Sequence, residues 1–227
     1  MSVLYSSSMP LAAASSNPPL HQLVYEKIRD MILYGDLAPG QPVTIHGLVS
    51  TLGLGTTPVR EAIRRLTAEG ALQSTDTRRV LVPLLHVSQL DELSHLRLAI
   101  EPHLARLAAE RISQGAIDGL EAIDKGLNDA IGAGDVQSYL RLNYAFHRTL
   151  YVHSNSEIAL SMADTLWLRA GPSLRVACGR YGTLNLPDMH EETIAALRKR
   201  DSDAAASAIA ADIRQGHSQI RRSLSEA

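Results

Sequence analysis

The chain has 227 residues, 45% of them hydrophobic and 4% aromatic, which suits two small, helix-rich domains with ordinary cores. A formal net charge of −2 excludes a protein that holds nucleic acid through its overall charge, so any such contact needs a local cluster of cations. The one cysteine, Cys178, excludes an internal disulfide. Because the sequence shows neither an apolar run of bilayer length nor a signal peptide, we expect the protein in the cytoplasm and not in a membrane.

The N-terminal segment begins with 19 residues that are rich in Ser, Ala and Pro and show no hydrophobic periodicity. This composition predicts a disordered tail at residues 1–19. Apolar side chains then recur at helical spacing over residues 20–33, and Gly35 follows as a stop signal. Thr44 is the expected N-cap of a second, short helix that ends at Gly53.

Residues 56–70 predict a third helix with two distinct faces. Thr57 is its expected N-cap, Pro58 suits the first helical position, and Gly70 suits the left-handed residue that ends a helix. The stripe expected to be buried consists of Val59, Ala62, Ile63 and Leu66. The opposite face presents Arg60, Arg64 and Thr67.

By itself, this pattern is more typical of a solvated helix whose arginines only add solubility, but the short helix upstream favours a DNA recognition helix. Two short helices joined by a glycine-containing turn form a helix-turn-helix, and residues 72–75 and 80–82 are expected to add the strands of a β wing around Arg78 and Arg79. A helix fits the major groove, where arginine reads guanine, and wing cations suit phosphates or the minor groove. We therefore expect a winged helix-turn-helix at residues 20–85.

This region resembles the winged-helix domain of GntR-type bacterial transcription regulators, in the motifs LAPG at 37–40, TPVREAIRRL at 57–66 and EG at 69–70. The resemblance implies DNA contacts from Thr56, Thr57 and Arg60, with the wing contacts near Arg78 and Arg79. Arg64, on the same outer face, completes the expected set. The family commonly has an arginine where this chain has Thr56, a glutamate-containing helix start where it has Thr44, and a glycine where it has Arg79, so the operator sequence cannot be inferred.

Beyond Pro83, every periodic segment is helical. Six helices are expected at residues 88–112, 116–131, 135–152, 156–178, 187–200 and 203–224. Because their links are short, residues 86–227 are expected to form an antiparallel helical bundle, so that the whole protein is mainly α. The absence of a glycine-rich phosphate loop argues against a nucleotide-binding fold.

Four side chains in this half are candidate metal ligands. Asn143 and His147 are spaced i, i+4, which puts both on one helix face, while His190 and His217 come from two later helices. Such a set could hold a divalent metal, although among nine histidines this spacing also arises by chance.

The second half resembles the all-helical FCD effector domain of the FadR branch of GntR regulators, in the motifs LRLAIEP at 96–102 and LAA at 107–109. The four candidates match that domain's metal ligands in order and approximate spacing, which implies a divalent ion, Zn or else Ni or Mn. Asn143 stands where the family usually has aspartate, and its neutral oxygen donates less charge, so the three histidines could hold the ion alone. The resemblance also implies that the metal and a nearby arginine, by position Arg97, receive the carboxylate of a small organic acid. The alternative for Arg97 is a surface ion pair with Glu101 one turn on.

The expected function is a ligand-responsive transcription regulator and not an enzyme. A homodimer would present two recognition helices to a pseudo-palindromic operator, and repression relieved by the effector is the favoured direction. One alternative keeps the DNA-binding domain but binds a long acyl ligand without a metal. Another is a metal-dependent enzyme that uses His147, His190 and His217, although no pattern such as His-Glu-x-x-His supplies a general base.

Overall fold

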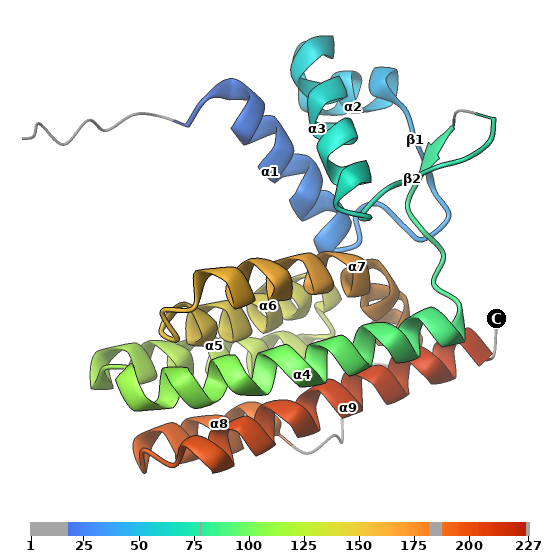
Figure 1. Ribbon diagram of the computed structural model, residues 1–227. Coiled ribbons are helices and arrows are strands. Elements are labelled where there is room, and N and C mark those ends of the chain that lie inside the picture. Colours follow the sequence, from blue (N-terminus) through green and yellow to red (C-terminus); the bar gives the residue numbers. More distant parts are fainter. Residues whose placement is uncertain (1–17, 78, 182–187, 226–227) are drawn as a thin grey trace, which may run out of the picture.

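The computed structural model describes residues 18–77, 79–181 and 188–225. These residues contain nine helices and three short strands. Three helices and the strands form an N-terminal unit, which sits on a bundle of the other six helices (Figure 1). Of the tail predicted at residues 1–19, residues 1–17 lie outside the described residues. Arg78 of the predicted wing lies outside them as well.

The N-terminal unit contains α1 (Leu20–Leu33), α2 (Ile45–Leu52) and α3 (Thr56–Ala68). Beside them, β1 (Pro42–Val43), β2 (Gln73–Ser74) and β3 (Val80–Leu81) form an antiparallel sheet in the order β1-β3-β2, with Val80 opposite both Val43 and Ser74. The winged helix-turn-helix is confirmed. Strand β1 was not predicted, because two residues are too few to show the alternation that marks a strand.

The ends of these helices follow the predicted signals in most cases. Thr44 caps α2 by accepting a hydrogen bond from the backbone N–H of Gly47 at 3.0 Å, and Gly53 and Gly70 adopt the left-handed conformation, with φ of 65° and 74°. The start of α3 differs from the prediction. Its N-cap is Gly55 with no side-chain cap, so Thr57 is already helical and Pro58 is the third residue, which is tolerated because N–H groups of the first turn lack intrahelical acceptors.

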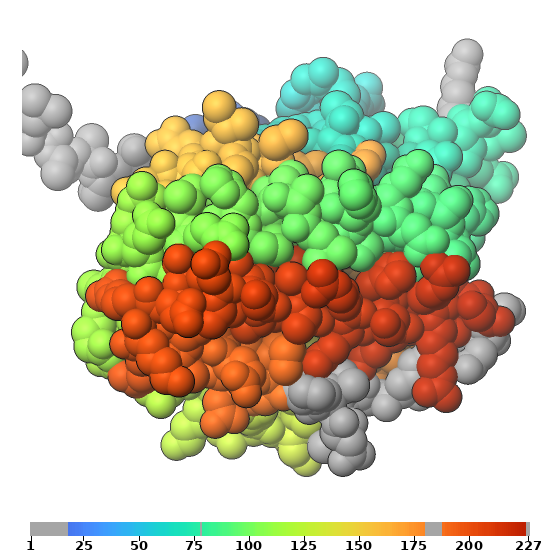
Figure 2. Space-filling view, turned by 60° about the horizontal axis from the view of Figure 1, so that its bottom comes forward, coloured from blue at the N-terminus to red at the C-terminus, as the bar shows by residue number. Residues whose placement is uncertain are grey.

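Six helices form the C-terminal bundle, each close to its predicted position. They are α4 (Val87–Arg111), α5 (Gln114–Ala133), α6 (Val136–Val152), α7 (Glu157–Tyr181), α8 (Met189–Arg198) and α9 (Ser202–Ser225). Helices α4 and α9 lie side by side along most of their length and cover one face of the molecule (Figure 2). No helix within the described residues is both long and apolar enough to cross a bilayer.

One buried hydrophobic cluster contains residues of both units. Val24, Ile28 and Ile32 of α1 belong to the same buried cluster as Trp167 and Leu168 of α7. The backbones also meet directly, since a Cβ atom on Gly171 would lie 2.3 Å from the carbonyl oxygen of Leu33. The N-terminal unit is therefore docked on the bundle through α1 and α7.

Candidate DNA-binding face and metal centre

Helix α3 separates a buried face from an exposed one, as its sequence pattern predicts. Its buried residues are Val59, Ala62, Ile63 and Leu66. Thr56, Thr57 and Arg60 are exposed, and Arg60 forms no ion pair with any described residue. The C-terminal end of α3 reaches the bundle, where Gly70 lies against Arg169, so its first turn is at the end remote from the bundle (Figure 1).

The other arginines of this region are placed differently. Arg64 forms an exposed ion pair with Glu61 at 2.6 Å, which costs little to break when a phosphate approaches. Arg65 lies over the Tyr25 ring, with 3.7 Å to the ring centroid, and therefore belongs to the packing of α3 on α1. Arg79 is exposed on the wing.

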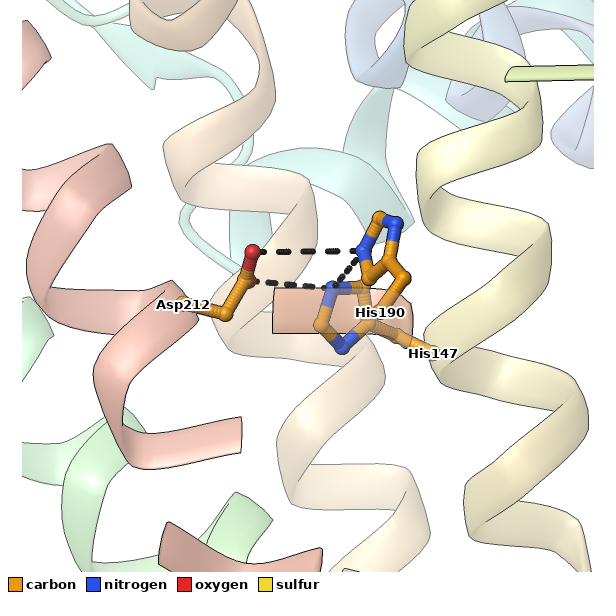
Figure 3. A group of neighbouring side chains, drawn as sticks. All are labelled: His147, His190 and Asp212. Atoms are coloured by element: carbon orange, nitrogen blue, oxygen red, sulfur yellow. Dashed lines mark hydrogen bonds and ion pairs between the residues drawn. The ribbon is translucent and has the colours of Figure 1, made fainter. Parts of the chain in front are cut away.

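Three side chains from three bundle helices converge in the interior. His147 comes from α6, His190 from α8 and Asp212 from α9, and the three point toward one another (Figure 3). The two imidazole Nε2 atoms are 3.3 Å apart; from the Asp212 carboxylate, the Nε2 of His147 is 3.1 Å away and that of His190 is 3.9 Å away. Both histidines are buried, whereas the Asp212 side chain is 22% exposed. The Nε2 atoms of the two histidines and a carboxylate oxygen of Asp212 can each donate a lone pair to a cation.

These spacings suit a divalent metal. Bonds of about 2.1 Å from one first-row ion to nitrogen and oxygen place neighbouring ligand atoms roughly 3.0 to 3.4 Å apart. Two of the three separations, 3.1 and 3.3 Å, fall in that range, and the third is 3.9 Å. The donor set, two imidazoles and a carboxylate, is one that Zn, Ni and Mn accept.

His217 does not reach this group. Its Nε2 atom lies 2.8 Å from the Asp91 carboxylate, which also pairs with Arg221, so the structure places Asp212 where the sequence led us to expect His217. Five residues along a helix turn a side chain by roughly 140° and displace it by roughly 7.5 Å, so residues 212 and 217 cannot face the same point. Asn143 is buried one turn before His147, and no described residue hydrogen-bonds its carboxamide.

Each histidine also has a partner on its outer nitrogen. The Nδ1 atom of His190 is 3.2 Å from Oδ1 of Asp124, a buried oxygen that has no well-aligned hydrogen bond within the described residues. The Nδ1 atom of His147 is 3.0 Å from the Tyr151 hydroxyl. Such contacts orient metal-binding imidazoles in many proteins.

The charges of the group favour a bound cation. Burial lowers the pKa of His147 and outweighs the attraction of Asp212. Burial also acts against the charged form of His190, but Asp124 and Asp212 together raise its pKa. Although burial raises the pKa of Asp212, the two imidazoles and Arg97 together hold it at about 2. The centre therefore carries a carboxylate at neutral pH.

Arg97 pairs with Glu101, but the pair is buried and not on the surface. The guanidinium Nε lies 2.6 Å from Oε1 of Glu101, and the Cζ atom of Arg97 lies over the Trp167 ring, 4.3 Å from the ring centroid. The cavity beside Arg97 measures about 10 Å³, room for one water at most. Nη1 of Arg97 has no hydrogen-bond partner within the described residues.

Two partners were missed in the sequence although a signal exists for each. Asp124 occupies the buried stripe of α5 between Leu120 and Leu127, and the half-buried Asp212 lies between the buried residues Ile209 and Ile213 of α9. A carboxylate at such a position needs a partner, because an unpaired charge is costly to bury.

Comparison with known proteins agrees with this architecture. The FCD domain matches residues 92–215, and the gntR family of bacterial regulatory proteins matches residues 20–82. The chain belongs to the GntR family. It is a DNA-binding transcription regulator with a winged-helix domain and a C-terminal FCD domain, as the sequence predicted.

Two relatives of this GntR protein match over most of their length. The transcriptional regulator McbR of Escherichia coli K12 is 28% identical over 201 residues, 86% of this chain and 90% of McbR. The transcriptional repressor RspR of the same organism is 26% identical over 208 residues, 90% of each chain. The solved structure of E. coli McbR/YncC superposes with a TM-score of 0.84 at 27% identity, covering 90% of this chain and 98% of that one.

Proposed function

We propose that this GntR protein is a ligand-responsive repressor whose FCD domain binds a divalent metal ion at His147, His190 and Asp212. The observation that carries the metal site is the convergence of two Nε2 atoms and a carboxylate at separations that suit one ion. Asn143, buried one turn before His147, is available as a further ligand. The preferred ion is Zn, with Ni or Mn as alternatives.

The metal would give the domain a place for a small organic acid. When bound, the ion offers open coordination positions to the carboxylate of such an effector. The free Nη1 of Arg97 supplies a second contact, provided that the cavity beside it opens. The acyl-ligand alternative is less well supported, because it gives no role to the buried polar centre.

The DNA-binding half would act as one arm of a homodimer. Thr56, Thr57, Arg60 and Arg64 would contact one half-site from α3, and Arg78 and Arg79 would contact the backbone or minor groove from the wing. A two-fold pair of chains then matches a pseudo-palindromic operator. Repression is supported by the relative RspR, which is a repressor.

Metal content tests the proposal directly. Purified wild-type protein should contain close to one equivalent of a divalent metal by elemental analysis, and Asp212→Ala should lose most of it. His217→Ala is the matched control, because that histidine contacts Asp91 and not the centre. A wild-type protein that neither contains nor takes up Zn, Ni or Mn would overturn the metal site.

A further inference from the structure

The tautomer of His147 is determined by a buried chain of hydrogen bonds behind it. Glu101 is fully buried and accepts hydrogen bonds from Nε of Arg97 at 2.6 Å, from the indole N–H of Trp167 at 3.0 Å and from the hydroxyl of Tyr151 at 2.8 Å. The Tyr151 oxygen is in turn 3.0 Å from Nδ1 of His147. A carboxylate with an arginine at 2.6 Å is an acceptor only.

The hydroxyl of Tyr151 has one hydrogen to share between two neighbours. If this hydrogen pointed at His147, lone pairs of Tyr151 and Glu101 would face each other at 2.8 Å in a buried site, which is unfavourable. The hydrogen therefore goes to Glu101, and Tyr151 accepts one from His147. Nδ1 of His147 must carry the proton, so its Nε2 is left with a lone pair that faces His190 and Asp212.

His190 is constrained in the same way by Asp124. Oδ1 of Asp124 is a buried acceptor without an aligned hydrogen bond in the described parts of the chain, and the nearest charged partner is Nδ1 of His190 at 3.2 Å. A proton on Nδ1 would satisfy this oxygen. In the neutral imidazole, the form that binds a metal, the Nε2 atom of His190 then also presents a lone pair to the centre, 3.3 Å from that of His147.

We propose that Tyr151 and Asp124 are positioning residues, which fix His147 and His190 in the Nδ1–H tautomer so that both Nε2 atoms and Asp212 present lone pairs to one cation. Arg97 and Glu101 anchor Tyr151 and act on the metal centre through it. This inference rests on the proposed metal site and gives four residues that are not metal ligands a role in orienting the two histidines. It also gives Arg97 a structural role in addition to its role as a contact for an acid.

The test combines zinc affinity with a direct reading of the tautomers. Zinc affinity is measured by competition with a chromogenic chelator for the wild type, Tyr151→Phe and Asp124→Asn. Each variant should bind zinc about 10- to 100-fold more weakly, the usual cost of losing a partner of a metal-bound histidine. The matched controls are Tyr25→Phe, which also removes a hydroxyl bound to a glutamate, and Asp118→Asn, an exposed carboxylate on the same helix as Asp124. Both controls should bind zinc as the wild type does.

Long-range ¹H–¹⁵N NMR of protein that contains ¹⁵N-labelled histidine reports which ring nitrogen carries the proton. We expect the Nδ1–H pattern for both histidines in the zinc-loaded wild type, and a mixture of tautomers for His147 in metal-free Tyr151→Phe. Zinc bound through Nδ1, or unchanged affinity and tautomers in both variants, would overturn the positioning role while leaving the metal site intact. If the wild type bound no zinc, the metal proposal would fail, and Nε2–H tautomers in that metal-free protein would overturn the inference as well.

Discussion

Tyr144 of α6 accepts a hydrogen bond from Arg29 of α1 at 2.5 Å, and this contact joins the bundle to the DNA-binding unit. The same hydroxyl donates to Asp164 of α7 at 2.7 Å. Tyr144 precedes His147 by three residues, and the Trp167 ring packs against both, with centroids 5.6 and 4.9 Å away. A residue beside the proposed metal centre is thus in contact with the first helix of the DNA-binding unit.

Tyr144→Phe should weaken the link between the two units. It leaves Arg29 without its neutral acceptor while keeping the ring packing, so we expect a loss of about 1 to 3 kcal/mol in the free energy of unfolding by urea. Operator affinity should also respond less to zinc. The measurement is fluorescence anisotropy on a genomic fragment selected by the wild type, with zinc and with EDTA. An equal zinc response in variant and wild type would show that coupling does not use this contact.

Arg60→Ala should reduce operator binding more than Arg64→Ala does. Arg60 is exposed without an ion pair to any described residue, whereas Arg64 already pairs with Glu61 at 2.6 Å. Loss of one base contact costs about 1 to 3 kcal/mol. Footprinting and anisotropy at fixed salt give the affinities, and zinc content checks that the FCD domain is intact. If Arg60→Ala bound the operator as the wild type does, α3 would not be the reading helix.

Glu101→Gln should be strongly destabilising. The substitution leaves the buried Arg97 without its counter-ion, for which we expect a loss of about 3 to 5 kcal/mol in the free energy of unfolding. Glu61→Gln breaks the exposed pair with Arg64 and should leave the free energy of unfolding nearly unchanged, because solvent screens that pair. The double variant Arg97→Met with Glu101→Leu should recover stability relative to Glu101→Gln, because no unpaired charge stays buried. Urea titrations compare all four proteins, and equal costs for the two single variants would contradict the buried pair.

Gly171→Ala should disturb the docking of the two units. The new Cβ would lie 2.3 Å from the Leu33 carbonyl oxygen, so α1 and α7 must separate, at a cost of about 1 to 3 kcal/mol. Gly119→Ala is the control, since no atom lies within 4 Å of its Cβ position, and it should stabilise α5 by up to about 1 kcal/mol. Calorimetry should show a lower Tm for Gly171→Ala and a higher one for Gly119→Ala. Equal shifts in the two would contradict backbone contact at Gly171.

Most of the fold was predictable from local signals. The periodicity of residues 20–33 reproduced α1, and Thr44, Gly53 and Gly70 marked real helix ends, because capping and left-handed glycines depend on a few neighbouring residues. The six bundle helices were found for the same reason. The missed strand β1 depends on pairing with β3, which lies more than 35 residues away in the sequence.

The proposed metal centre was only partly predictable. The sequence identified His147 and His190 as candidates, but only the packing of α9 against its neighbours decided that Asp212 faces them and that His217 meets Asp91. Burial of the Arg97–Glu101 pair and its link to Tyr151 likewise depend on how α4, α6 and α7 meet. Residue type and spacing along one helix show which groups share a face; which groups from different helices come within bonding distance is determined by the tertiary packing.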